Sequence, residues 1–154
     1  MRQFIIVALL LTFTGCSHNP PPPTPAAAVA DAASKVEDSG TAILTAAQTA
    51  NGQINPLNGK PVISTAQLDV VALACDKLGR LGSTLAKALT DYSAAKAAGA
   101  NTAALAAAIV SMVNDATAAL NTIGKSIPNG TVAAIDTAVT TALGLYATIK
   151  AGVL

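Results

Sequence analysis

The stretch ISTAQLDVVALACDKLGRLGSTLAKALTDY, residues 63–92, decides the fold of this chain. Its apolar positions recur at alternating spacings of three and four residues: Leu68, Val71, Cys75, Leu78, Gly82, Leu85, Leu89 and Tyr92. This spacing places all of them on one face of a helix, in the manner of a heptad seam. The stretch therefore predicts a long helix near 65–98 that buries one continuous apolar face.

The sequence also predicts where this helix begins and ends. Ser64 and Gln67 have the spacing of a capping box, and Ile63 and Leu68 are placed for a hydrophobic staple. Gly99 is suited to end the helix. Charged residues at i,i+4 spacing occupy the side opposite the apolar face, as Asp76–Arg80 and Lys87–Asp91.

Three further segments repeat the pattern and predict helices near 25–50, 102–126 and 131–152. The first starts at Thr24-Pro25, because Thr caps helices and Pro suits the first helical position. Pro128-Asn129-Gly130 separates the last two, and Thr131 is the expected cap of the last. The expected apolar faces are Val29, Ala33, Val36, Gly40, Ile43, Ala47 and Ala50, then Leu105, Ile109, Met112, Ala116, Leu120 and Ile123, then Val132, Ile135, Val139, Leu143, Tyr146, Ile149 and Val153.

Composition and connection lengths assign the fold class. Alanine dominates the chain, aromatic residues are 3% and charged residues 11%, and alanine is the strongest helix former. Short links favour antiparallel neighbours, and four amphipathic helices are most simply buried in a bundle. We expect an all-α, Ala-rich antiparallel four-helix bundle over 25–154. The one sizeable irregular stretch, 53–63, holds the turn Pro56–Gly59, and the sequence does not say whether this turn binds anything.

The first residues have the organisation of an export segment. Arg2 precedes a short apolar run, FIIVALLL at 4–11, which is shorter than the roughly 20 residues that span a bilayer. The following FTGC, residues 13–16, resembles the lipobox of bacterial lipoproteins. The resemblance implies a signal peptide over 1–15, cleavage between Gly15 and Cys16, and lipidation of Cys16. It also implies attachment to the cell envelope and, with Ser17 next in a Gram-negative host, to the outer membrane facing the periplasm.

A proline-rich segment separates this cysteine from the first helix. SHNPPPPTP favours an extended polyproline rod, so residues 16–24 are interpreted as a lipidated cysteine and a tether of roughly 20–25 Å. His18, the one histidine, lies in this tether without carboxylate neighbours, so we expect no metal and no other cofactor. Without Arg2, basic and acidic residues balance and are spread along the chain, which argues against a nucleic-acid partner.

Few residues of the helical part could carry chemistry. Cys75 is either a core residue or a free thiol that bridges a dimer. Tyr92 and Tyr146 are expected in the seams. The acids are expected on solvated helix faces: Asp31, Glu37, Asp38, Asp69, Asp76, Asp91, Asp115 and Asp136. Since the helical part has no histidine to serve as a base and no Gly-rich phosphate loop, we do not expect an enzyme.

Three functional hypotheses follow. The first is a membrane-anchored structural or protein-interaction module that binds another envelope protein or itself. The second is a phage-derived or membrane-active envelope protein with a lysis, exclusion or pore-forming role, because the start of the chain resembles the outer spanins in its cysteine followed by prolines. The third is a carrier of a small apolar ligand inside the bundle.

Overall fold

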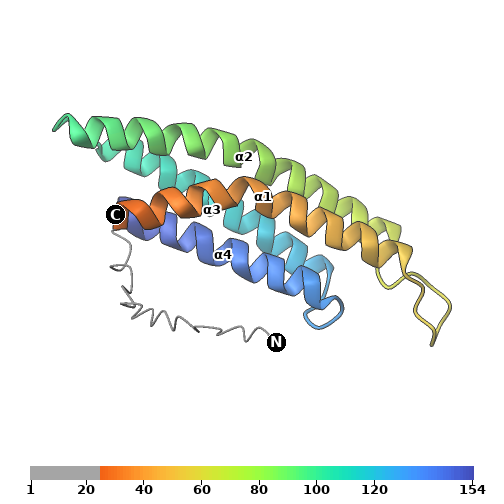
Figure 1. Cartoon of the computed structure of the whole chain (residues 1–154). Coiled ribbons are helices and arrows are strands. Elements are labelled where there is room, and N and C mark those ends of the chain that lie inside the picture. Colours follow the sequence, from red (N-terminus) through yellow and green to blue (C-terminus); the bar gives the residue numbers. More distant parts are fainter. Residues whose placement is uncertain (1–24) are drawn as a thin grey trace, which may run out of the picture.

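The computed structural model describes residues 25–154, apart from the side chains of Pro25, Ala26 and Glu37. These residues form four helices, α1 (Pro25–Gly52), α2 (Thr65–Ala97), α3 (Ala103–Ser126) and α4 (Ala133–Val153). The helices run up and down in turn as an antiparallel bundle (Figure 1). The expected all-α class and the four-helix bundle are therefore confirmed, and each helix begins and ends within about two residues of its expected bounds.

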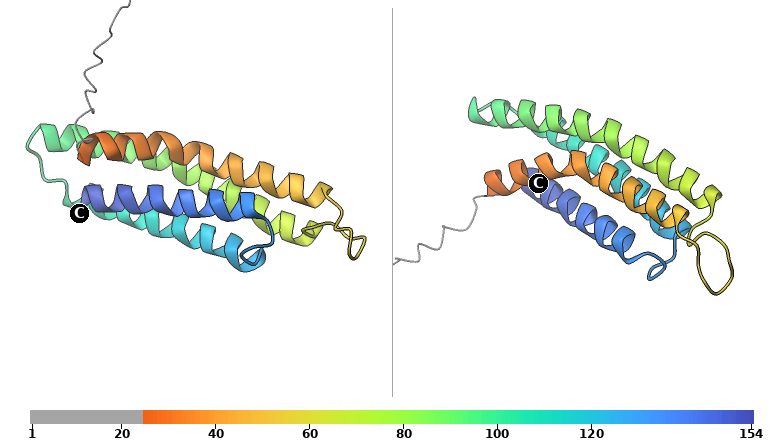
Figure 2. Two further views of the ribbon diagram at one scale, coloured as in Figure 1. Left: turned by 60° about the horizontal axis from the view of Figure 1, so that its bottom comes forward. Right: turned by 45° about the vertical axis from the view of Figure 1, so that its right-hand side comes forward.

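The helices are arranged as a closed ring. Each helix packs against the one that follows it in the chain, and α1 packs against α4 to complete the ring. Figure 2 shows the two ends of this bundle: the α1–α2 and α3–α4 connections lie at one end, whereas the start of α1, the α2–α3 connection and the C-terminus lie at the other. Thus the point where the N-terminal segment joins the bundle is far from the irregular stretch at 53–63.

The capping box at the start of α2 is present as predicted. The Gln67 backbone N–H donates to Ser64 Oγ, and the Ser64 backbone N–H donates to Gln67 Oε1 over 2.8 Å. The same Gln67 side chain donates from Nε2 to the backbone oxygen of Ser126 over 2.8 Å. This residue therefore caps its own helix and also fastens the start of α2 to the end of α3.

The core follows the predicted face of α2 closely. All its expected residues are buried except Leu68, which is half-buried, and Ala74 joins them. Opposite them, α1 buries Val36, Gly40, Ile43, Ala47 and Ala50 as predicted. Gly40 permits a close approach, because a Cβ there would lie 3.4 Å from the backbone oxygen of Cys75. At the α1–α2 contact, small residues of α1 therefore pack against larger residues of α2.

The apolar faces of α3 and α4 differ in part from the prediction. Val113 is buried where Met112 was expected, and Ala142 is fully buried while Val139 and Leu143 are half-buried. Both the expected and the observed sets of buried residues have helical spacing, so periodicity alone does not predict which of two adjacent apolar residues is buried. The packing of neighbouring helices decides which of these residues is buried. Where two helices lie close together, only a short side chain such as alanine fits between them, and longer side chains lie to either side.

The predicted cap of α4 is wrong. Its N-cap position is Val132, which makes no side-chain cap bond, and Thr131 lies one residue earlier. Instead, Asp136 Oδ2 in the first turn accepts from the Gly130 backbone N–H over 2.7 Å. Gly130 has φ 84°, a left-handed conformation that glycine adopts without strain. The Asp136 carboxylate therefore holds the turn before α4, and the Thr131 hydroxyl does not cap the helix as expected.

The central position of the α2 seam gives the first prediction. Leu78 is 1% exposed, whereas Leu73 on the same helix is 73% exposed. Leu78→Ala should lower the free energy of unfolding by about 2–5 kcal/mol, since it removes buried methyl groups and leaves a cavity. Leu73→Ala, the same chemical change on the outer face, should alter it by less than about 0.5 kcal/mol. Urea denaturation followed by circular dichroism measures both; equal losses would contradict the assigned core.

Candidate functional site

The strongest candidate for a functional surface in the described residues is the connection between α1 and α2. Residues 53–62 form a short hairpin, which we call the distal hairpin because it lies at the end opposite Pro25 (Figures 1 and 2). An isolated antiparallel bridge joins Ile54 and Pro61. The Asn55 N–H donates to the Lys60 carbonyl over 2.8 Å, and the Val62 N–H donates to the Gln53 carbonyl over 2.9 Å. The hairpin is thus closed by backbone hydrogen bonds on both sides of the bridge.

Asparagine side chains hold the tip of the distal hairpin. Asn55 Oδ1 accepts from the Leu57 N–H and Asn58 Oδ1 accepts from the Lys60 N–H, each over 2.9 Å. These are Asx turns, in which a side chain replaces a backbone acceptor. Gly59 completes the turn with φ 66°, in the left-handed region that favours glycine. The asparagine, proline and glycine pattern in the sequence predicted a turn here, and the structure shows how the turn is fixed.

The hairpin is also fastened to the helices that it joins. Asn51 Nδ2, in the last turn of α1, donates to the Ile63 carbonyl over 3.0 Å. The Ile63 side chain is fully buried, and Ser64 directly after it caps α2. The base of the distal hairpin is therefore part of the core, which fixes the direction in which the tip projects.

The tip itself presents apolar side chains to solvent. Leu57 is 93% exposed and Ile54 is 59% exposed, whereas the α2 seam buries nearly all of its large apolar residues. Lys60 is the one charged residue between positions 53 and 63. Exposed apolar residues on an ordered loop are typical of a protein-contact surface. The sequence had located this turn but gave no means to tell which of its apolar residues would be exposed.

Cys75 lies in the core, the first of the two alternatives that the sequence offered. It is a buried free cysteine on the α2 face that meets α1. Burial raises the pKa of its thiol from the usual 9.0 to about 11, partly offset by a hydrogen bond with the Leu44 backbone. Since the thiolate is the reactive form, the thiol is held in its inert state at neutral pH.

The tyrosines occupy different environments. Tyr146 is fully buried, and its hydroxyl has no hydrogen-bond partner in the described part of the chain. Burial raises the pKa of Tyr146 to about 12. Tyr92 lies near the end of α2, where its hydroxyl donates to the Val153 carbonyl over 3.5 Å. Tyr92 thereby links α2 to the end of α4.

The described carboxylates do not come together into a site. Asp31, Asp76 and Asp91 each pair with a Lys or Arg one turn away on the same helix, and Asp115 on α3 lies 3.8 Å from Lys77 Nζ on α2. Among the described side chains, no group of three or more that could ligate a metal lies together. Cys16, Gly15 and His18 lie outside the described residues, so the predicted lipidation and cleavage site remains a prediction from sequence.

Comparison with known proteins adds no assignment: no protein-family model, no curated protein and no solved structure matches this chain.

The raised thiol pKa gives a prediction about pH. Below pH 9 the thiol is protonated in both folded and unfolded chains; between pH 9 and about 11 the unfolded chain ionises first, which pulls the equilibrium towards unfolding. The free energy of unfolding should therefore fall by about 1–2 kcal/mol more in the natural protein than in Cys75→Ala between pH 8 and 10.5.

Urea titrations of both proteins at these two pH values measure that difference, and the contribution of Tyr146 is common to both. Identical pH dependence in the two proteins would show that the thiol is not shielded from solvent.

Proposed function

We propose that this chain is a lipid-anchored envelope protein without catalytic activity, whose helical bundle presents the distal hairpin to a protein partner. The observation that carries this proposal is the ordered, apolar tip at Ile54 and Leu57, fixed at the end of the bundle opposite Pro25. The lipobox-like sequence at residues 13–16 supports an anchor at Cys16, and the proline run supports a tether between that anchor and α1.

Dimensions favour this arrangement. α1 has 28 residues, which at a rise of 1.5 Å per residue is about 40 Å. A chain anchored at Cys16 joins the bundle at Pro25, so the distal hairpin would stand about one bundle length, plus the tether, from the membrane surface. Such a position suits contact with a protein of the envelope rather than with the lipid that holds the anchor.

The charge distribution supports an interaction module rather than an enzyme or a nucleic-acid binder. Four of the described basic residues are paired with carboxylates on exposed helix faces: Lys35, Lys77, Arg80 and Lys87. The described residues therefore offer no concentrated basic surface for phosphates. The exposed residues of the distal hairpin include the apolar Ile54 and Leu57 together with amide side chains and one lysine, which suits a protein contact with an apolar centre and a polar edge.

A membrane-active role is the second candidate, and one observation favours it. Among the described helices, α3 alone is long and apolar enough to cross a membrane by length and composition. The core helix of a soluble protein passes the same test, and α3 contributes Ile109, Val113 and Ile123 to the bundle core. Leakage of dye from phospholipid vesicles on addition of the full chain would favour this candidate over the interaction module.

The contact surface is tested by photocrosslinking in cells. A photoreactive amino acid at position 57 should give a discrete crosslinked product in the envelope, because Leu57 stands at the apolar tip. The same amino acid at position 73 is the matched control, since Leu73 is also exposed but lies on the side of α2. Leu57→Asp should abolish crosslinking from position 54, and Leu73→Asp should leave it intact. Equal products from positions 57 and 73 would contradict a specific contact at the hairpin.

The anchor is tested separately. Cys16→Ala should abolish incorporation of a radioactive fatty acid into the chain and release it from the membrane fraction, because the acyl groups would be attached through that cysteine. Cys75→Ala is the control and should leave labelling unchanged, since Cys75 is buried in the core. Undiminished labelling of the Cys16→Ala chain would exclude the proposed anchor.

A further inference from the structure

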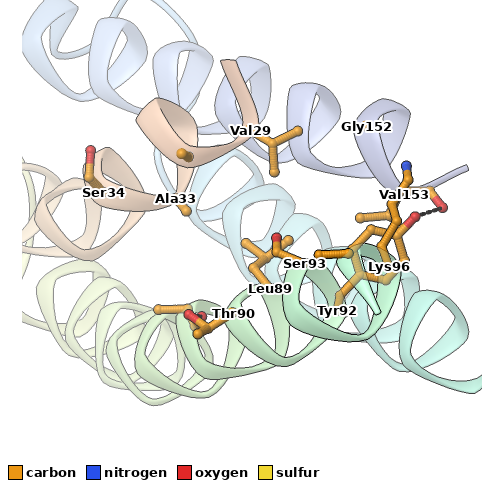
Figure 3. Close-up of a pocket in the computed structure, with 13 residues that line it drawn as sticks. Val29, Ala33, Ser34, Leu89, Thr90, Tyr92, Ser93, Lys96, Gly152 and Val153 are labelled. Atoms are coloured by element: carbon orange, nitrogen blue, oxygen red, sulfur yellow. Dashed lines mark hydrogen bonds between the residues drawn. The ribbon is translucent and has the colours of Figure 1, made fainter. Parts of the chain in front are cut away.

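A cavity of about 720 Å³ lies beside the start of α1 (Figure 3), at the other end of the bundle from the distal hairpin (Figure 2). It opens between the start of α1, the last three turns of α2 and the end of α4, and nothing in the proposed function uses it. Its volume falls within the range of about 300–1,000 Å³ that is usual for small-molecule sites. We call it the proximal cavity, because it adjoins the residues where α1 begins.

The wall of the proximal cavity is mainly apolar and is shaped by small side chains. Ala30 and Ala33 on α1 and Ala86 on α2 leave space that longer residues would fill, while Val29, Leu89 and Val153 supply apolar surface. One edge is closed where α1 meets α4: a Cβ at Gly152 would collide with Cγ2 of Val29. The space is therefore a largely apolar recess between three helices, which suits a hydrocarbon chain.

One cation stands at the mouth of this recess. Lys96 lines the cavity, and its Nζ lies 5.6 Å from the centre of the Tyr92 ring. Figure 3 shows Lys96 and Tyr92 side by side at the end of α2, beside Val153. Lys96 makes no ion pair with any side chain that the structure describes, in contrast to Lys87 on the same helix, which pairs with Asp91. Its ammonium group is held near the cavity by the ring and remains available to an anion.

The remaining polar groups agree with an anionic head. Ser93, one turn before Lys96, lines the cavity and its hydroxyl has no partner in the described part of the chain. Among the described residues that line the cavity there is no Asp or Glu. A second cavity, between α3 and α4, differs on this point because it contains both Lys125 and Asp136. The proximal cavity thus combines an apolar interior with a net positive mouth, and the second cavity does not.

We propose that the proximal cavity binds a single-chain amphiphile with an anionic headgroup, such as a fatty acid, with its chain between α1, α2 and α4 and its headgroup at Lys96 and Ser93. The ammonium and the hydroxyl both donate hydrogen bonds to a carboxylate or phosphate oxygen. This inference does not depend on the proposed contact at the distal hairpin, and either can fail without the other.

The proposal is tested with a palmitic acid that carries a diazirine in its chain, added to membrane vesicles that contain the full protein. After irradiation, peptide mass spectrometry should place the crosslinks at residues 29–34, 86–97 and 152–153. The same diazirine chain ending in an alcohol should label these residues about three- to fivefold less, as expected for loss of one exposed charge interaction. Equal labelling by the acid and the alcohol would overturn the role of Lys96.

Variants with matched controls separate the cavity from general surface labelling. Ala86→Phe fills the cavity and should abolish the crosslinks, whereas Ala107→Phe, at an exposed position on α3, should retain them. Lys96→Gln should lower labelling by the acid about three- to fivefold, and Lys96→Arg and Lys87→Gln should retain it. Crosslinks that persist in Ala86→Phe would show that the probe binds elsewhere.

An acyl group on Cys16 would have hydrocarbon chemistry in common with the proposed ligand but would lack its anionic head. The labelling is therefore repeated in the Cys16→Ala protein. Crosslinks of equal strength with and without Cys16 support a separate anionic amphiphile. Crosslinks that occur only in Cys16→Ala would mean that the chain's own acyl group fills the cavity, and would overturn the proposal.

Discussion

The burial of the apolar face of α2 is the constraint on which the rest of the structure depends. At 33 residues α2 is the longest of the described helices, and its seam packs against α1 on one side and α3 on the other. An isolated helix of this composition would be marginal in water, because most helical stability in proteins comes from packing of the apolar face. The other helices are therefore positioned by what α2 must bury.

The residues at the start of α2 fix the position of the distal hairpin. Gln67 caps α2 and also holds the last turn of α3, while Ile63, one residue before the cap, is buried in the core. This arrangement anchors both ends of the distal hairpin, so that its tip projects in a fixed direction with Leu57 in solvent. A surface of this kind has its apolar residues ordered in advance, which lowers the entropy cost of binding a partner.

Small residues give the two ends of the bundle different properties. Gly40 and the alanines of α1 allow close contact with α2 near the middle, where the core is well filled. Towards the start of α1, Ala30, Ala33 and Ala86 line the proximal cavity with short side chains, and the space beside Lys96 stays open. The same alanine-rich composition thus allows a close helix contact near the middle of the bundle and a recess at its proximal end.

The sequence by itself determined the fold class, the helix bounds, the capping box and nearly all of the α2 face, because these depend on local spacing and on residues close together in the chain. It also located the turn at Pro56–Gly59. It could not choose between Met112 and Val113, because adjacent apolar residues both fit the helical period. It indicated Thr131 as the cap of α4 and did not predict the bond from the Gly130 N–H to Asp136, which depends on how the turn brings two residues six positions apart together. The exposed tip at Leu57 and the meeting of Val29, Lys96 and Val153 around one cavity were decided only by the tertiary structure. Those residues are separated by tens of positions in sequence, and only the packing of α1, α2 and α4 brings them together.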